Sequence, residues 1–123
     1  MPVAKLNVQR QMRPQISTLI WHTIYKRLID HESTVQMPDI VGVRNNVYWL
    51  DHDNIETEAQ AAISHNQSKS NDWEVAMVHA LVRHVIRQGV YKSSDIAVLT
   101  PYTGQLQKLR ASMRRDFEIV LSN

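Results

Sequence analysis

The stretch DIAVLT at residues 95–100, closed by Pro101, decides the fold class of this chain. It is a short apolar run that a proline ends, which is the pattern of a strand buried on both faces of a parallel sheet. Helical patterns lie on either side of it, over residues 72–88 and 103–115. Strands that alternate with helices of this length predict parallel pairing through crossover helices. We therefore expect an α/β fold, a three-layer parallel sheet flanked by helices.

Two further helix signals support this prediction. An apolar stripe at helical spacing, entered through a proline, predicts a helix over residues 14–25. The helix over 72–88 begins with a capping box, in which Asn71 caps the first turn and Glu74 reaches back to it. Gly89 then supplies a left-handed residue that ends the helix.

The remaining segments divide into strands and loops. The aromatic and β-branched run NVYWLD at 46–51 predicts a strand, with its rings packed in the sheet rather than offered for base stacking. The run FEIVL at 117–121 predicts another inner strand. Residues 30–45 show no clean period and are expected to be irregular, and the polar segment 52–70 is expected to be a surface loop.

Composition limits the class of protein. With 43% hydrophobic and 21% charged residues in 123, the chain predicts one small globular domain rather than a disordered or fibrous protein. No apolar run approaches the roughly 20 residues that span a bilayer, so we expect no membrane partner. The absence of cysteine excludes disulfides and thiolate metal sites, and it is compatible with an intracellular location, in the nucleus or cytoplasm.

Glycine and histidine spacing exclude several kinds of site. Gly42, Gly89 and Gly104 are the only glycines, and they cannot form a dinucleotide fingerprint or a phosphate-binding P-loop. Any nucleotide chemistry must therefore take its main phosphate site from another domain or chain. The six histidines lack the spacing of a zinc site, so no bound metal is expected.

Charge is unevenly distributed although the net charge is only +2. Residues 1–29 and 103–115 are basic, and residues 51–74 are acidic. The two basic zones would form a nucleic-acid face if the fold brings them together, and otherwise they are solvated helix faces. Both interpretations remain open at this point.

Two positions have the chemistry of ligand contacts. The run QRQMRP at 9–14 places cations and amides just before a helix amino terminus, where the helix dipole attracts phosphate. The alternative is a basic lead-in that binds nothing. The turn Thr100-Pro101-Tyr102 follows a predicted strand, at the sheet edge where ligands of α/β proteins collect. Tyr102 either contacts a ligand there or packs in the core.

Three motifs resemble those of a known family. The run LNVQRQMRPQIS at 6–17 resembles motif IV of superfamily 1 helicases related to the nonsense-mediated-decay helicase. The run LTPYTGQ at 99–105 is similar to the Thr-Pro-Tyr-x-x-Gln segment of that family, and NDWEVA at 71–76 is similar to its Asn-x-x-Glu-Ala helix start. The wider pattern resembles the zinc-finger-bearing branch that is linked to RNA silencing and antiviral defence.

The resemblance implies a partial second RecA-like domain over residues 1–123, which is a P-loop NTPase fold without the P-loop and is incomplete at its C-terminus. ATP and Mg²⁺ would be held mainly by a first RecA-like domain of the same protein. The family motifs place one group of residues toward ATP and another toward single-stranded RNA or DNA. These are Gln9, Arg10 and Gln11 for ATP, and Thr100, Tyr102 and Gln105 for nucleic acid.

The resemblance also implies limits on activity. The chain stops before the Gln-Gly-Glu motif and the final arginine motif of the family, so no complete catalytic set is expected and the chain alone should not hydrolyse ATP. Gln11 stands where the family has an arginine, and a neutral amide cannot neutralise a phosphate. Three hypotheses follow: part of an ATP-dependent helicase with RNA-silencing partners, a non-catalytic RNA-binding or scaffold remnant, or an unrelated α/β domain.

Overall fold

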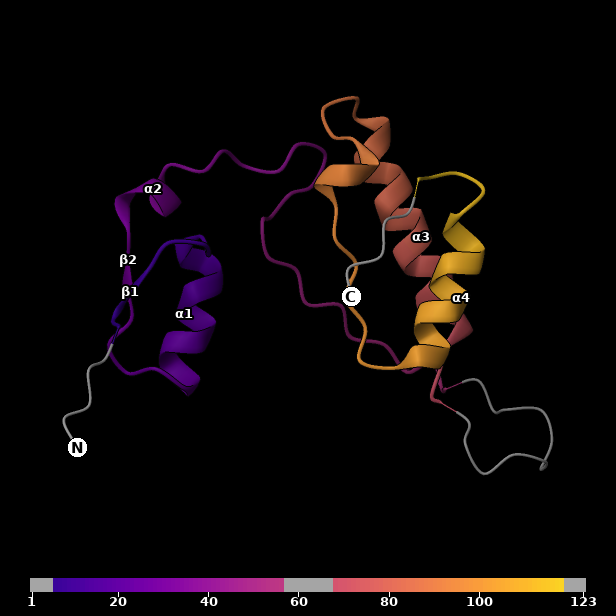
Figure 1. The fold of residues 1–123 in the computed structure, drawn as a ribbon, viewed down its shortest axis with the longest axis horizontal. Coiled ribbons are helices and arrows are strands. Elements are labelled where there is room, and N and C mark those ends of the chain that lie inside the picture. The colour runs from indigo at the N-terminus through magenta and orange to yellow at the C-terminus, as the bar shows by residue number, and fades with distance from the viewer. Residues whose placement is uncertain (1–5, 57–67, 119–123) are drawn as a thin grey trace. The chain divides into compact units, whose positions relative to one another are not determined.

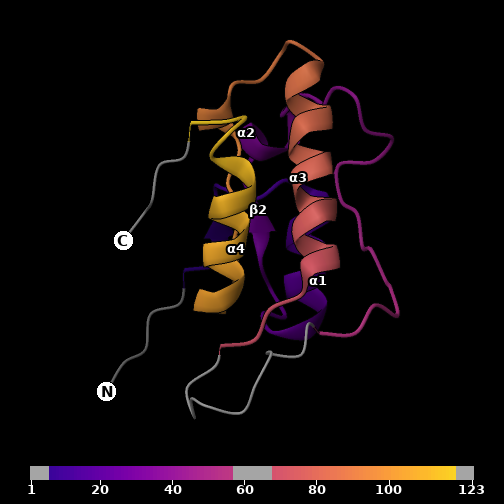
Figure 2. The same cartoon turned by 90° about the vertical axis from the view of Figure 1, so that its right-hand side faces the viewer.

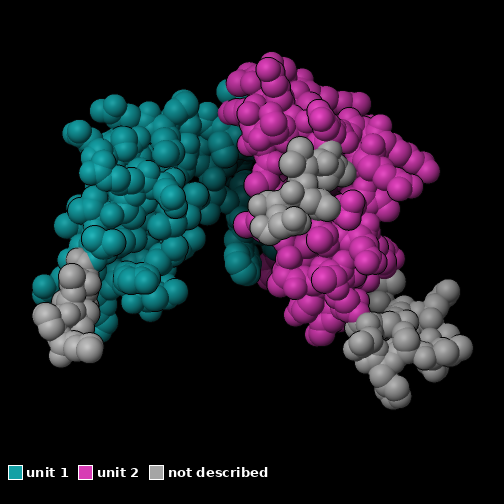
Figure 3. All heavy atoms as spheres, in the orientation of Figure 1, with its two compact units in different colours: residues 1–50 teal, residues 51–123 magenta. Residues whose placement is uncertain are grey.

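The computed structural model describes residues 6–56 and 68–118. Residues 57–67 of the predicted loop and 119–121 of the predicted last strand lie outside the described residues. The chain divides into two compact units, residues 1–50 (unit 1) and residues 51–123 (unit 2), which Figure 3 draws in different colours.

Unit 1 is built around a strand–helix–strand element. Strand β1 (Val8–Gln9) is followed by helix α1 (Pro14–Thr23) and strand β2 (Ile29–Asp30), and the two strands pair in parallel (Figure 1). The Ile29 N–H donates to the Asn7 carbonyl at 2.6 Å, and the His31 N–H donates to the Gln9 carbonyl at 3.0 Å. Neither strand was predicted, because two residues are too few for an alternating pattern. Their parallel pairing around a helix agrees with the predicted α/β class.

Helix α1 confirms the first predicted helix and ends two residues earlier than expected, with Ile24 as its C-cap. The expectation that 30–45 is irregular is wrong at its start, where Asp30 belongs to β2 and a short helix, α2 (Glu32–Val35), follows. The His31 ring accepts from the Ser33 N–H at 3.2 Å, and the buried Thr34 hydroxyl donates to the His31 carbonyl at 2.7 Å. These polar contacts form the turn without apolar periodicity, so the sequence pattern missed it.

Unit 2 consists mainly of two helices that lie side by side (Figures 1 and 2). Helix α3 (Asp72–Arg87) and helix α4 (Thr103–Met113) confirm the predicted helices to within two residues at each end. Gly89 follows α3 with a φ of 76°, the left-handed conformation expected for its stop signal. None of the helices in the described parts of the chain is long and apolar enough to cross a bilayer.

The apolar core of the described residues lies between α3 and α4. Val75 and Val82 of α3 meet Leu109 and Met113 of α4, and all four are buried. The spacing of seven residues on α3 and four on α4 places each pair on one helix face. Partly buried side chains complete this core: Val78, Ile86, Ile96 and Phe117.

Two predicted strands are wrong for the described residues. Residues 46–51 form no strand, and the packing predicted for their rings is absent, with Trp49 88% exposed. Of residues 95–100, Asp95 ends a one-turn helix, Ser93–Asp95, and an extended segment follows. In this segment Leu99 is 92% exposed rather than buried. A strand requires a neighbouring strand for its backbone N–H and C=O groups. Among the described residues, neither of these two segments has such a neighbour. Local β preference alone therefore forms no strand in either segment.

Candidate functional site

The turn between β1 and α1 is organised by the side chain of Gln9. Its Nε2 donates to the Met12 carbonyl at 2.5 Å and to Asp30 Oδ1 at 2.6 Å. Its Oε1 accepts from the backbone N–H groups of Gln11 at 3.0 Å and Met12 at 2.7 Å. Both ends of the amide are therefore bound within the protein, so Gln9 shapes the turn and ties it to the end of β2.

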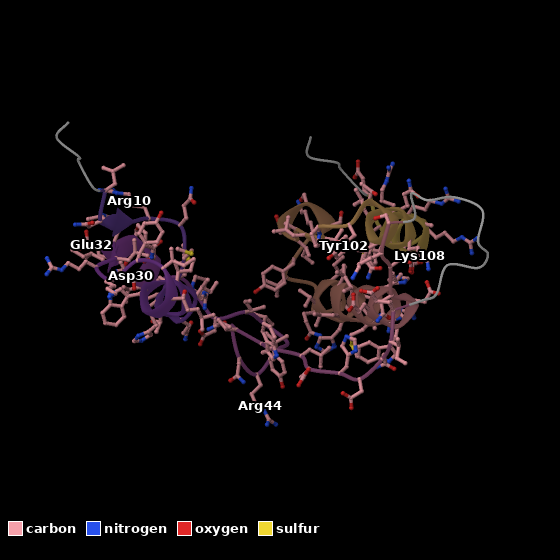
Figure 4. All side chains as sticks on the ribbon, turned by 90° about the horizontal axis from the view of Figure 1, so that it is seen from below. Arg10, Asp30, Glu32, Arg44, Tyr102 and Lys108 are labelled. Atoms are coloured by element: carbon pink, nitrogen blue, oxygen red, sulfur yellow. The ribbon has the colours of Figure 1, made fainter. Side chains whose placement is uncertain are left out.

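Arg10 and Gln11 occupy the same turn and lie at its surface. Both residues are exposed, and neither side chain has a hydrogen-bond or ion-pair partner within the ranges 6–56 and 68–118 (Arg10 is labelled in Figure 4). They follow the carboxyl end of β1 and precede the first turn of α1. This is the place in an α/β unit where the dipole of a helix start favours a phosphate.

Arg13 has a structural partner instead. Its Nη2 donates to the Pro38 carbonyl at 2.7 Å and its Nη1 lies 3.7 Å from Asp39 Oδ1, so the side chain is only 13% exposed. Asn46 extends the contact, because its Nδ2 donates to Asp39 Oδ1 at 2.6 Å and its Oδ1 accepts from the Ile40 N–H at 2.9 Å. The guanidinium of Arg13 thus fastens the loop at 38–46 to the start of α1.

The second predicted ligand position is the turn that leads into α4. Thr100 Oγ1 accepts from the Tyr102 N–H at a long 3.4 Å, and Tyr102 is the N-cap residue of α4 without a side-chain cap bond. Tyr102, which is labelled in Figure 4, is exposed rather than packed in the core. Thr100 and Tyr102 belong to unit 2 and residues 9–11 to unit 1, so their predicted common edge stays a prediction.

Gln105, the third predicted nucleic-acid residue, is only 6% exposed. Its Oε1 accepts from the Asn71 N–H at 2.8 Å, and its Nε2 donates to the Asn71 carbonyl at 3.3 Å and to Glu74 Oε2 at 3.1 Å. The predicted capping box is therefore half right. Asn71 caps α3 as expected, but Gln105 takes the N–H that Glu74 was expected to reach.

Asn71 connects this cluster to a third segment. Its Oδ1 accepts from the Trp73 and Glu74 N–H groups at 3.0 and 3.2 Å, and its Nδ2 donates to the Asn54 carbonyl at 3.0 Å. The His52 ring lies 4.4 Å from the Trp73 ring, and its Nε2 is 3.4 Å from Glu74 Oε1. We call Asn71, Glu74 and Gln105 the polar junction. Its residues belong to two separate sequence motifs, and neither motif indicates their contact.

The start of α4 also touches Ser68 closely. The Ser68 hydroxyl accepts from the Gly104 N–H at 3.0 Å and so supplies the cap that Tyr102 lacks. A Cβ at position 104 would lie 2.7 Å from the Ser68 carbonyl oxygen, which is too short for any other residue without a shift of the backbone. This approach explains why a glycine stands inside the first turn of α4.

Some of the charged side chains of unit 2 form ion pairs with one another. Lys108 Nζ lies 2.6 Å from Asp72 Oδ1, and Lys69 Nζ lies 3.3 Å from Glu56 Oε1. The acidic zone thus partly neutralises the second basic zone. Within the described ranges no three His, Asp or Glu side chains gather as metal ligands would.

A groove of about 430 Å³ lies beside the extended segment of unit 2. Its lining is mostly apolar and includes Val98, Leu99 and Leu106, with Arg110 and Glu118 as the charged members. Such a surface suits hydrocarbon rather than a triphosphate. The groove therefore adds nothing to a nucleotide site.

Comparison with known proteins identifies the chain's relatives. The family described as "AAA domain" matches residues 1–121. The chain is 38% identical over 112 residues to the mouse "NFX1-type zinc finger-containing protein 1", covering 91% of the chain and 6% of that protein. It is 37% identical to the human protein of the same name over 91% of the chain and 6% of that protein. It is 33% identical over 106 residues to the fission yeast "Helicase required for RNAi-mediated heterochromatin assembly 1", covering 85% of the chain and 10% of that protein.

The chain spans about 6 to 10% of the length of these curated relatives, and no solved structure matches it. The family match covers nearly every residue, including the motif IV run and the Thr-Pro-Tyr segment, and it removes the alternative of an unrelated α/β domain. The chain belongs to this AAA-domain family, within the superfamily 1 helicases.

Proposed function

We propose that the chain is part of an ATP-dependent superfamily 1 helicase that acts on single-stranded RNA or DNA. In this proposal it is the second RecA-like domain, and a first RecA-like domain of the same protein holds most of the ATP and Mg²⁺. The three-layer sheet forms in that longer protein. The name of the fission yeast relative, a helicase required for RNAi-mediated heterochromatin assembly, supports RNA-silencing partners and an intracellular location for this chain as well.

The turn at residues 9–12 carries the proposal. Gln9 is bound on both sides of its amide, so its contribution to ATP binding is to hold the turn in shape. Arg10 then presents a guanidinium that has no partner among the described residues, beside the start of α1, where it can reach a phosphate. Gln11 can add a neutral hydrogen bond. Arg13 cannot substitute for the missing family arginine, because it is held by Pro38 and Asp39.

The turn at Thr100–Tyr102 supplies the contact with nucleic acid in this proposal. The exposed Tyr102 ring offers a stacking surface for a base, and the Thr100 hydroxyl offers a polar contact to the backbone. Contacts of this kind depend little on sequence, so we expect slight sequence specificity.

The test measures ATP turnover stimulated by single-stranded RNA in a protein that joins this chain to its first RecA-like domain. Arg10→Ala should lower kcat by about tenfold or more, since a phosphate-contacting arginine stabilises the charge of the transition state. Gln11→Arg should raise kcat, because it restores a cation where the family has one. Lys26→Ala replaces a basic residue that lies beyond α1, and it is the control that should leave kcat unchanged.

The same experiment decides the second candidate function, a non-catalytic RNA-binding module. The exposed neutral Gln11 favours this candidate. That candidate is supported if ATP turnover is negligible and stays negligible in Gln11→Arg. RNA binding should then persist, and its affinity should fall steeply as the salt concentration rises.

A further inference from the structure

We infer that the polar junction positions the Tyr102 turn for single-stranded nucleic acid, so that Gln105 acts as a positioning residue and not as a contact. The inference rests on the proposed binding at Thr100 and Tyr102. It departs from the sequence-based expectation, which placed Gln105 itself against the nucleic acid.

Gln105 is buried, and both ends of its amide are already bound within unit 2. Its oxygen holds the Asn71 N–H, and its nitrogen is shared between the Asn71 carbonyl and Glu74. Asn71 is 5% exposed, which leaves little room for a ligand to approach the amide from that side. Buried amides that are hydrogen-bonded at both ends in this way fix the elements that carry them.

The junction joins three separate stretches of unit 2. Asn71 holds the Asn54 carbonyl, and its backbone meets Gln105 across 34 residues of sequence. His52 adds a ring contact with Trp73 next to Asn71. The first turn of α4 is therefore fastened to the first turn of α3 and to the segment at 52–54.

Tyr102 is attached to this framework through its backbone. Its carbonyl accepts from the Leu106 N–H at 3.0 Å, one residue beyond Gln105, and the Gly104 N–H is held by Ser68. By contrast, the turn's own contact between Thr100 Oγ1 and the Tyr102 N–H is long, at 3.4 Å. The backbone of Tyr102 is thus fixed through the first turn of α4, which the junction holds at Gln105. A ring held in place before binding costs less conformational entropy when a base stacks on it.

The experiment uses the full chain and a labelled oligouridine of about 15 nucleotides as the probe, with affinity read from fluorescence anisotropy. Tyr102→Ala removes the proposed contact and should weaken binding about tenfold. Gln105→Glu keeps the acceptor for the Asn71 N–H but sets a carboxylate against Glu74, and it should weaken binding about fivefold to tenfold.

Two variants separate positioning from other causes. Gln107→Glu makes the same chemical change on the same helix at an exposed residue without a junction contact, so it should weaken binding less than about twofold. Combining Gln105→Glu with Glu74→Gln restores a donor and an acceptor between the two positions, and it should recover most of the lost affinity. A residue that only stabilises the fold would not lower the affinity of the folded protein, which circular dichroism monitors at the assay temperature.

The outcomes distinguish the inference from the proposed function. If Tyr102→Ala weakens binding and Gln105→Glu does not, the positioning role is overturned and the binding turn stands. If Gln107→Glu costs as much as Gln105→Glu, long-range charge explains the loss and the positioning role is again overturned. If Tyr102→Ala is silent, the proposed binding turn itself fails. If Gln105→Glu does not fold, Ser68→Ala serves as the second variant, because it removes the contact to Gly104 from an exposed position. It should weaken binding about threefold. An unchanged affinity would count against the inference.

Discussion

The interiors of the two units are stabilised by different kinds of contact. In unit 2 the buried side chains are largely apolar, and Val75, Val82, Leu109 and Met113 form one cluster between two helices. In the described part of unit 1 the buried residues are Ser17 and Thr34, whose hydroxyls donate to backbone carbonyls. Unit 1 is thus a set of hydrogen-bonded turns around a short parallel pair, and unit 2 is a small helical core.

This difference indicates that unit 1 depends more than unit 2 on contacts with surrounding structure. Burying one large aliphatic side chain stabilises a fold by about 1.5–3 kcal/mol, whereas one hydrogen bond contributes about 0.5–1.5 kcal/mol net. Helix α1 of unit 1 still carries its predicted apolar stripe, but Leu19 is exposed, and so is Ile24 just beyond the helix. The helix was correctly predicted, and the described part of unit 1 offers its apolar stripe no buried surface to pack against.

The largest effect is expected from emptying the core of unit 2. Leu109→Ala removes a side chain that is 5% exposed, and it should lower the free energy of unfolding of unit 2 by about 2–5 kcal/mol. Urea unfolding of the full chain, followed by circular dichroism, measures this change. Leu106→Ala on the same helix, at an exposed site, is the control and should cost less than about 1 kcal/mol. Equal losses for both variants would show that the α3–α4 contact is not the core.

A smaller effect is expected at the turn that organises unit 1. Gln9→Leu keeps the volume of the side chain but removes its contacts with Met12, Gln11 and Asp30, and it should cost about 1–3 kcal/mol locally. Hydrogen exchange of the His31 amide, which bonds to the Gln9 carbonyl, reports the local opening. Gln15→Leu, at an exposed position of α1, is the matched control. Faster exchange in the control variant alone would contradict the role of Gln9.

The smallest effect is expected at the ion pair of unit 1. Asp39→Asn removes the charge opposite Arg13 but keeps the oxygen that accepts from Asn46. Because the Asp39 side chain is 89% exposed and the pair is 3.7 Å long, the change should be below about 0.5 kcal/mol. Exchange of the Ile40 amide, which donates to Asn46, measures it. A large loss would mean that the ion pair, rather than the bond from Arg13 to the Pro38 carbonyl, fastens the loop.

The helices could be predicted from the sequence because their signals are local. Caps, apolar spacing and Gly89 act within a few residues, and α1, α3 and α4 begin and end within two residues of the expected positions. Strands depend on distant neighbours, so the runs at 46–51 and 95–100 were predicted where the described structure has none. The same dependence hid β1 and β2, which are defined by their mutual pairing.

The candidate site shows the same contrast between local signals, which the sequence contains, and contacts between distant residues, which it does not. Motif recognition selected the 9–11 turn and the Thr100–Tyr102 turn, and the structure leaves Arg10, Gln11 and Tyr102 exposed there. It did not reveal that Gln9 is bound internally, nor that Gln105 pairs with Asn71 across 34 residues. A single sequence contains no signal for a hydrogen bond over that separation.

The buried hydroxyls of Ser17 and Thr34 also give the two units different responses to temperature. Exposing apolar surface raises the heat capacity of the unfolded state, and exposing polar groups lowers it. Opening unit 1 should therefore change the heat capacity little, so its stability varies almost linearly as the solution is warmed or chilled. Unit 2 should follow a curved dependence, because the apolar contribution that holds α3 to α4 fades in the cold.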